Sequence, residues 1–205
     1  MDGTLADTLQ DIANAVNYSL QNLGKAQLDL QTVRKFIGDG VKKFLKRALE
    51  NPEPPLLEKA LHLFREYYSE HLCDFTALYP GTHEILEYFS HKKKVVLTNK
   101  PQEYALPLVK HLQIETYFEE VIGGNSGYPL KPDPAGILDI IRRHKSNKLQ
   151  TIIIGDSEND ILGGQNADIQ TCAVTFGFRP EELLRSLKPN FVIDDLEALK
   201  KTILK

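Results

Sequence analysis

The sequence predicts an α/β protein in which a Rossmann-like, doubly wound parallel sheet carries an inserted helical domain. Two observations lead to this prediction. Up to about residue 80, apolar residues recur at three- and four-residue spacings, which is typical of amphipathic helices. Beyond that point, short apolar runs alternate with helical stretches, which indicates parallel strands joined by helices that cover both faces of a sheet. We therefore expect residues 1–8 and 81–205 to form the α/β domain and residues 9–80 to form the insertion.

The insertion contains three amphipathic segments, over residues 9–23, 33–49 and 57–68. Gly24 ends the first segment, and the prolines within residues 52–55 separate the second from the third. Helices of this kind bury their apolar faces against one another. We therefore expect a small helical bundle.

Strands and helices alternate through the rest of the chain. The predicted strands cover residues 94–98, 120–123, 151–155, 171–175 and 191–193, and the predicted helices lie near residues 82–91, 102–112, 134–144 and 158–166. In an open sheet of this type, ligands bind outside the carboxyl ends of the strands. The residues that follow each strand are therefore the first candidates for a functional site.

Composition excludes several classes of partner. The net charge of −3 argues against nucleic acid, which favours a basic surface. No apolar run approaches the length of a membrane span, and the acidic N-terminus does not resemble a signal peptide. Two cysteines in apolar surroundings indicate reduced thiols in a cytoplasmic protein, and the six histidines lack the spacing of zinc ligands. We expect a monomer or a homodimer whose partner is a small metabolite.

Four short motifs combine polar residues at the places where a ligand would bind. They are Asp2-Gly3-Thr4-Leu5-Ala6-Asp7-Thr8, Thr98-Asn99-Lys100, Lys131-Pro132-Asp133-Pro134 and Gly155-Asp156-Ser157-Glu158-Asn159-Asp160. Taken singly, these motifs also fit a turn, a helix cap or a solvated lysine. The two aspartates of the last motif are harder to explain that way, because neighbouring carboxylates repel unless a cation lies between them.

The order of these motifs resembles the four-motif series of the haloacid dehalogenase superfamily. The resemblance covers essentially the whole chain, and the helical insertion resembles the mobile cap domain of that superfamily. It implies a Mg²⁺-dependent phosphatase that forms an aspartyl-phosphate intermediate. Since true dehalogenases lack the second aspartate of the first motif, Asp2 favours phosphate chemistry.

The resemblance also implies a role for each matching residue. Asp2 would protonate the leaving group and then deprotonate water. Thr98 would hydrogen-bond a phosphoryl oxygen, and Lys131 would supply positive charge to the nucleophile and the phosphate. Asp156 would bind Mg²⁺ directly, Asp160 would hold the waters of the metal, and the main-chain carbonyl of Asp2 would add an oxygen.

Further resemblance to phosphoglycolate phosphatases suggests the substrate. The stretches that carry it cover residues 36–45, 79–81 and 188–195. It implies hydrolysis of 2-phosphoglycolate to glycolate and phosphate, with Gly3, Thr4 and Asn99 near the substrate. Lys43 of the insertion is our expected contact for the substrate, and a solvated helix face is the alternative interpretation of this lysine.

The first motif of the superfamily reads Asp, any residue, Asp-Gly-Thr, and its first aspartate is the nucleophile. Asp2 occupies the second aspartate position, so the nucleophile would directly precede Met1. We therefore expect an upstream segment of about 5–10 residues that ends in aspartate, matching a strand in length. We also expect Asp2 to lie at the carboxyl edge of the sheet between the strands at 94–98 and 151–155, with an empty or otherwise filled lane behind it. The 205 residues alone are expected to be inactive as a phosphatase. A sugar phosphomutase, a pyrophosphatase-like relative and a non-catalytic phosphate-binding protein remain alternatives.

Overall fold

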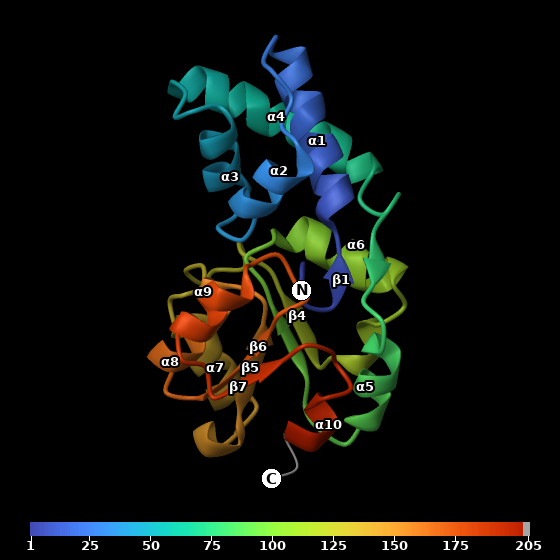
Figure 1. Cartoon of the computed structure of the whole chain (residues 1–205), viewed down its shortest axis with the longest axis vertical. Helices are drawn as coiled ribbons and strands as arrows, with labels where there is room; N and C mark the ends of the chain where they lie inside the picture. Colours follow the sequence, from blue (N-terminus) through green and yellow to red (C-terminus); the bar gives the residue numbers. More distant parts are fainter. Residues whose placement is uncertain (203–205) are drawn as a thin grey trace.

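The computed structural model describes residues 1–202, so the last three residues of the predicted segment 81–205 lie outside the described residues. Four helices gather at one end of the molecule, and most strands lie at the other (Figure 1). The helices are α1 (Leu9–Asn22), α2 (Leu30–Phe36), α3 (Val41–Ala48) and α4 (Pro54–Glu70). Their buried faces share one apolar core, which includes Val16, Leu20, Leu45 and Phe64. These four helices all lie within residues 9–80. Within residues 1–202, no helix combines the length and the apolar character that crossing a bilayer would need.

The second predicted helical segment, residues 33–49, forms two helices rather than one. The chain turns between α2 and α3, where Gly38 has φ = +120° and Gly40 has φ = +83°. Residues with a side chain rarely adopt this backbone conformation, whereas glycine does so at little cost. The two glycines therefore end α2 and bring a loop of the helical bundle toward the strands.

The α/β part follows the predicted alternation closely. Its strands are β3 (Val95–Leu97), β4 (Glu120–Ile122), β5 (Ile152–Gly155), β6 (Gln170–Val174) and β7 (Phe191–Ile193). Its helices are α5 (Thr82–Tyr88), α6 (Gln102–His111), α7 (Ala135–Arg143), α8 (Glu158–Asn166), α9 (Glu181–Ser186) and α10 (Leu199–Thr202), with short 3-10 helices at Glu115–Tyr117 and Lys148–Gln150. All pairings among these strands are parallel, which confirms the α/β class.

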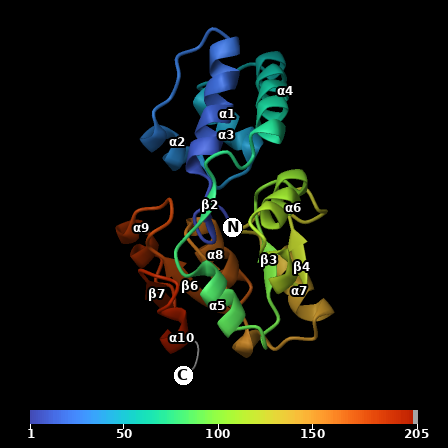
Figure 2. The same cartoon turned by 90° about the vertical axis from the view of Figure 1, so that its right-hand side faces the viewer.

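The parallel strands fall into two groups, in agreement with the expected lane without a strand between residues 94–98 and 151–155. Among residues 1–202, β3 and β4 form one parallel sheet, and β5, β6 and β7 form another. The N-terminal residues lie between the two sheets (Figure 2). There they form a tight turn, in which the N–H of Leu5 donates to the carbonyl of Met1 at 2.9 Å and the N–H of Gly3 donates to the carbonyl of Ala6 at 2.9 Å. Because the backbone groups of this turn bond to one another, the turn forms no ladder of hydrogen bonds with β3 or β5.

Two very short strands join the helical bundle to the α/β part. β1 (Ala6–Asp7) pairs antiparallel with β2 (Ala77–Leu78), at the points where the chain leaves the α/β part and returns to it. Asp11 in the first turn of α1 secures the returning segment, because its carboxylate accepts hydrogen bonds from the N–H of Phe75 at 3.1 Å and of Thr76 at 2.9 Å. The sequence did not predict these strands, since two residues are too few to show alternation.

Candidate active site

A cavity of about 90 Å³ lies between the carboxyl ends of β3 and β5 and the helical bundle. Its polar wall consists of Asp2, Thr98, Asn99, Lys100, Lys131, Asp156, Ser157, Asn159, Asp160 and Arg179. Its apolar wall includes Ile12, Ile37, Val41, Phe44, Phe64 and Tyr68 of the bundle. The structure thus brings together the predicted residues Asp2, Thr98, Asn99, Lys131, Asp156 and Asp160.

Asp156 follows β5 directly and is almost fully buried. Its Oδ1 accepts a hydrogen bond from the hydroxyl of Thr4 at 2.9 Å, and its Oδ2 accepts one from the N–H of Phe178 at 2.8 Å. Burial, followed by the negative charge of Asp160, raises the pKa of Asp156 to about 6. A cation beside this carboxylate would therefore be strongly favoured.

Asp160 and Lys131 form a buried ion pair at 2.6 Å. The ammonium group of Lys131 also donates to the carbonyl of Leu97 at 2.6 Å, which fixes the lysine at the end of β3. The other carboxylate oxygen of Asp160 accepts from the N–H of Ser157 at 3.1 Å and from its hydroxyl at 2.6 Å, closing a capping box at the start of α8. Burial acts to raise the pKa of Asp160, but the charge of Lys131 outweighs it and the pKa is lowered.

The carboxylate of Asp2 faces Lys100, a residue that the sequence analysis did not assign to the site. The ammonium nitrogen of Lys100 lies 3.1 Å from Oδ1 of Asp2, and this oxygen also accepts from the hydroxyl of Thr8 at 2.9 Å. Burial acts to raise the pKa of Asp2, but the charge of Lys100 outweighs it and lowers the pKa. The signal was present in the sequence, because Lys100 completes the Thr-Asn-Lys run that follows β3.

Asn99 and Thr4, both expected near the substrate, position other groups of the site, whereas Thr98 faces the cavity. Thr98 lines the cavity itself, with its hydroxyl oxygen accepting from the N–H of Lys100 at 3.1 Å. Asn99 instead bonds the main chain of Lys131, and its amide also donates to the carbonyl of Gly38 at 2.9 Å. Thr4 is engaged with Asp156 as described above. It therefore holds a carboxylate of the site rather than lining the cavity.

Gly3 is also absent from the cavity wall, and it has a packing role. It adopts φ = +72°, and a Cβ on it would lie 2.1 Å from Oδ2 of Asp156. No side chain larger than hydrogen fits there. Gly3 therefore allows the first motif to pass directly beside the carboxylate of Asp156.

Lys43 does not meet the expectation of a contact in this cavity. Its side chain is exposed and lines a separate hollow together with Lys42, Lys46 and Glu58. The reason is the helical register of α3, in which Phe44 and Leu45 take the buried face. Gly38 and Gly40 from the preceding turn and Val41 at the start of α3 reach the cavity instead.

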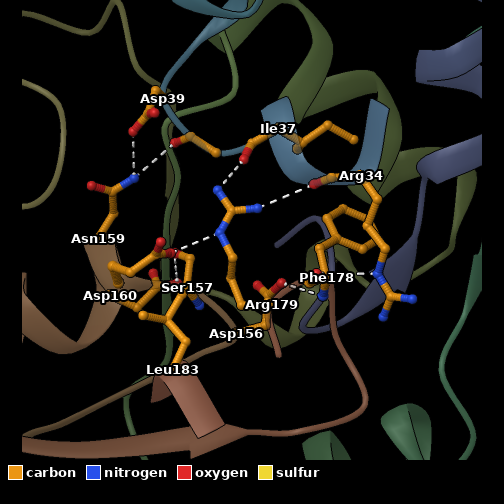
Figure 3. A network of polar contacts seen from close by, with 12 residues as sticks. Arg34, Ile37, Asp39, Asp156, Ser157, Asn159, Asp160, Phe178, Arg179 and Leu183 are labelled. Atoms are coloured by element: carbon orange, nitrogen blue, oxygen red, sulfur yellow. Dashed lines mark hydrogen bonds and ion pairs between the residues drawn. The ribbon is translucent and has the colours of Figure 1, made fainter. Parts of the chain in front are cut away.

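Several polar contacts hold the helical bundle over the cavity (Figure 3). Arg179 is central, because its guanidinium donates to the carbonyls of Ile37 at 2.6 Å and Arg34 at 3.1 Å while it pairs with Glu158 at 2.7 Å. Asn159 adds hydrogen bonds to the carbonyl of Gly38 at 3.2 Å and to the carboxylate of Asp39 at 2.9 Å. The guanidinium of Arg34 in turn donates to the carbonyls of Gly177 and Phe178. The described arrangement is therefore a closed one.

The oxygen atoms around Asp156 suit a hard divalent cation. Mg²⁺ is commonly held by one or two carboxylates and keeps several waters, so Asp156 with Asp160 nearby is an adequate donor set. In residues 1–202, no three His, Cys, Asp or Glu side chains converge as a metal cluster. The carboxylate of Asp2 is turned to Lys100 and Thr8, so the main-chain carbonyl remains the atom of Asp2 that we expect near a metal.

The fold defines a class of protein, namely α/β proteins whose ligand site lies at the carboxyl ends of parallel strands. Within this class, residues 1–174 match the model of the haloacid dehalogenase-like hydrolases, and the chain belongs to that family. This confirms the family predicted from the four motifs.

Relatives and solved structures agree with this assignment. The chain is 35% identical to a phosphoglycolate phosphatase from Psychrobacter arcticus, with 100% of the chain and 93% of the relative covered. It is 32% identical to a phosphoglycolate phosphatase from Pseudomonas putida, with 97% of the chain and 76% of the relative covered. A structure described as a predicted phosphoglycolate phosphatase from Haemophilus somnus superposes with a TM-score of 0.91 at 28% identity, over 98% of the chain and 94% of that structure. A haloacid dehalogenase-like hydrolase from Streptococcus pneumoniae gives a TM-score of 0.89 at 27% identity over the same shares. These names support the predicted phosphatase activity.

Proposed function

We propose that the protein is a Mg²⁺-dependent phosphomonoesterase that hydrolyses a small phosphorylated metabolite, with 2-phosphoglycolate as its substrate. The observation that carries the proposal is that Asp2, Thr98, Lys131 and Asp156 line one small cavity. Cleavage of a phosphate ester needs positive charge on the phosphoryl oxygens and a proton for the leaving oxygen. Lys131 supplies the positive charge, Thr98 a hydrogen bond to the phosphate, Asp2 the proton and Asp156 a ligand for the metal. The names of the relatives indicate the substrate.

The proposed roles follow from the contacts of each residue. Lys131, fixed by Asp160 and the carbonyl of Leu97, places its ammonium group beside the phosphate. The hydroxyl of Thr98, at the end of β3, donates a hydrogen bond to a phosphoryl oxygen. Asp156 would bind Mg²⁺ and Asp160 would hold the waters of the metal, which would neutralise charge on the phosphate. In its protonated form Asp2 transfers a proton to the leaving oxygen, and the resulting carboxylate, which Lys100 stabilises, later takes a proton from water.

In this proposal the helical bundle is the cap of the site. The contacts of Arg179, Asn159 and Asn99 with the loop before α3 hold the bundle closed over the cavity. A closed cavity keeps bulk water away from the reacting phosphate, and opening admits substrate and releases product. The short β1–β2 pair is where we expect the two parts to hinge.

The nucleophile in the family motif is the aspartate two residues before the one matched by Asp2. The experiment therefore compares the 205-residue chain with the same chain preceded by a strand-length segment ending in aspartate directly before Met1. A third form carries the same segment ending in asparagine. Phosphate release is measured over a panel of phosphorylated metabolites, with Mg²⁺ and with excess chelator.

We expect phosphate release from 2-phosphoglycolate only with Mg²⁺, and we expect the form with aspartate before Met1 to release more phosphate than the form with asparagine. Equal turnover in all three forms would contradict the proposed nucleophile, and full turnover in chelator would contradict the metal. Interconversion of sugar phosphates without phosphate release would identify a phosphomutase, and release from pyrophosphate a pyrophosphatase-like enzyme. Ligand binding with no reaction in any form would indicate a phosphate-binding protein.

A further inference from the structure

Lys100 is a buried cation whose place in the site is not explained by phosphate binding. It is 7% exposed and lies between Asp2 and Tyr68 of α4, so it connects the α/β part with the helical bundle. Its ammonium nitrogen is 2.6 Å from the hydroxyl oxygen of Tyr68 and 4.7 Å from the centre of the Tyr68 ring. Lys131, by contrast, is held by Asp160 and by the carbonyl of Leu97 at the end of β3.

Lys100 and Tyr68 retain hydrogen-bonding capacity toward the cavity that both line. An ammonium group has three N–H donors. In the part of the chain that the structure describes, the donors of Lys100 meet two acceptors, Asp2 and Tyr68. Because the hydroxyl oxygen of Tyr68 accepts from Lys100, its own proton remains available to a further acceptor.

The surroundings favour an anion at this position. Tyr104 packs edge-on against Tyr68 at 5.0 Å, and Phe64 lies 5.2 Å from Tyr68, both measured between ring centres. Aromatic walls exclude water and lower the local dielectric, which strengthens an interaction between a lysine and a carboxylate. The third cation of the cavity, Arg179, already pairs with Glu158 and with carbonyls of the bundle.

We propose that Lys100 and Tyr68 together bind a carboxylate on the leaving group of the substrate, and so select phosphate esters of small α-hydroxy acids. The inference rests on the proposed function, because it takes the leaving oxygen to lie beside Asp2. In an α-hydroxy acid, one carbon separates that oxygen from the carboxylate. Lys100 lies 3.1 Å from Asp2, which is the side of the cavity that this carboxylate reaches.

The cavity volume and the origin of the two residues fit this assignment. A volume of about 90 Å³ suits a small substrate. Lys100 follows β3 and Tyr68 belongs to α4, so one carboxylate contacts both parts of the protein. Binding of the acid therefore also stabilises the closed arrangement of the bundle.

The first test compares two substrates of similar size, 2-phosphoglycolate and 2-hydroxyethyl phosphate, in the form of the protein that releases phosphate. The readout is the ratio of their kcat/KM values, because loss of Lys100 also disturbs Asp2 and lowers both. Lys100→Met is expected to reduce the ratio by about 10- to 100-fold, as for a lost hydrogen bond to a charged group. Tyr68→Phe keeps the ring and is expected to reduce it by about 3- to 10-fold. Lys43→Met is the matched control, since its exposed side chain lies outside the cavity.

The second test does not depend on turnover. Glycolate is expected to raise the melting temperature of the 205-residue chain, whereas ethylene glycol is not. Tyr68→Phe should weaken this protection, and it serves as the informative variant if Lys100→Met fails to fold. Lys100→Arg should restore part of the protection that Lys100→Met loses, because arginine keeps the charge.

The outcomes separate this inference from the proposed function. If no form of the protein releases phosphate from 2-phosphoglycolate but glycolate still protects through Lys100, the proposed function fails and the carboxylate site stands. If 2-phosphoglycolate is hydrolysed while Lys100→Met and Tyr68→Phe leave the substrate ratio unchanged, the carboxylate site is overturned. A fall in the ratio for Lys43→Met instead, or no protection by glycolate, would overturn it as well.

Discussion

The side-chain amide of Asn99 holds the main chain of Lys131 on both sides. Its Oδ1 accepts from the N–H of Lys131 at 2.9 Å, and its Nδ2 donates to the carbonyl of Lys131 at 2.9 Å. The same Nδ2 donates to the carbonyl of Gly38 in the helical bundle. Asn99 therefore positions the lysine of the site and at the same time joins it to the loop that closes the cavity.

Asn99→Ala should lower kcat by about 100-fold, because a small displacement of Lys131 removes its charge from the phosphate. Steady-state kinetics with 2-phosphoglycolate measures this effect. Asn159→Ala is the matched control, since Asn159 also donates to Gly38 but makes no bond to Lys131. We expect that control to change KM more than kcat. Equal effects of both variants on kcat would show that Asn99 acts only through the helical bundle.

The buried carboxylate of Asp11 is expected to stabilise the segment through which the chain returns from the helical bundle. Asp11→Ala removes the acceptor of Phe75 N–H, Thr76 N–H and the Thr76 hydroxyl, which lies 2.7 Å from the carboxylate. The free energy of unfolding should fall by about 2–4 kcal/mol, since bonds to a buried charge are lost and donors remain unpaired. Urea denaturation measures the change.

The control for that prediction is Asp74→Ala in the same segment. Asp74 pairs with His71 at the surface, where ion pairs contribute about 0–1 kcal/mol. A loss of stability in Asp74→Ala as large as that in Asp11→Ala would contradict the assignment. The segment as a whole, and not the buried carboxylate of Asp11, would then set the stability.

Comparison of Gly3→Ala with Gly24→Ala tests whether Gly3 is needed for the site around Asp156. Both have positive φ, +72° and +66°, so alanine at either position meets about 1–2 kcal/mol of backbone strain. Only at Gly3 would the added Cβ lie against Asp156, whereas nothing lies within 4 Å of a Cβ at Gly24. Gly3→Ala should therefore lower the melting temperature further, and it should also raise the Mg²⁺ concentration needed for half-maximal activity. Equal Mg²⁺ dependence in the two variants would contradict the role of Gly3 in shaping the site of Asp156.

The sequence predicted the parts of the site that follow directly from chain order. Thr98 and Asp156 come at the ends of apolar strands, and parallel strands bring such ends to one edge. The contact between Lys100 and Tyr68 was not predictable in this way, because it joins a loop after β3 to a helix 32 residues away. No pattern in either segment specifies how the helical bundle packs over the strands.

The prediction that Lys43 contacts the substrate cavity was wrong for a different physical reason. The loop with Gly38 and Gly40 does reach the cavity. The lysines that follow them lie on α3, however, where the apolar residues Phe44 and Leu45 determine which face is buried. Helical periodicity within residues 41–48 was therefore a better guide to the direction of Lys43 than its distance in sequence from the two glycines.

Asp2→Asn tests the proton transfer that we propose for the first motif. The substitution keeps the shape of the side chain and an acceptor for the hydroxyl of Thr8, but it removes the group that exchanges a proton with the leaving oxygen and with water. Turnover of 2-phosphoglycolate should fall by about two to four orders of magnitude, as is typical when a general acid–base group is lost. Asp7→Asn is the matched control, because Asp7 is an exposed carboxylate of the same motif and asparagine can still accept from the N–H of Leu9. Inhibition by inorganic phosphate is measured in both variants, so that weak binding is not mistaken for slow chemistry. Retention of phosphate inhibition with lost turnover would support the role of Asp2, whereas undiminished turnover in Asp2→Asn would require another proton donor in the cavity.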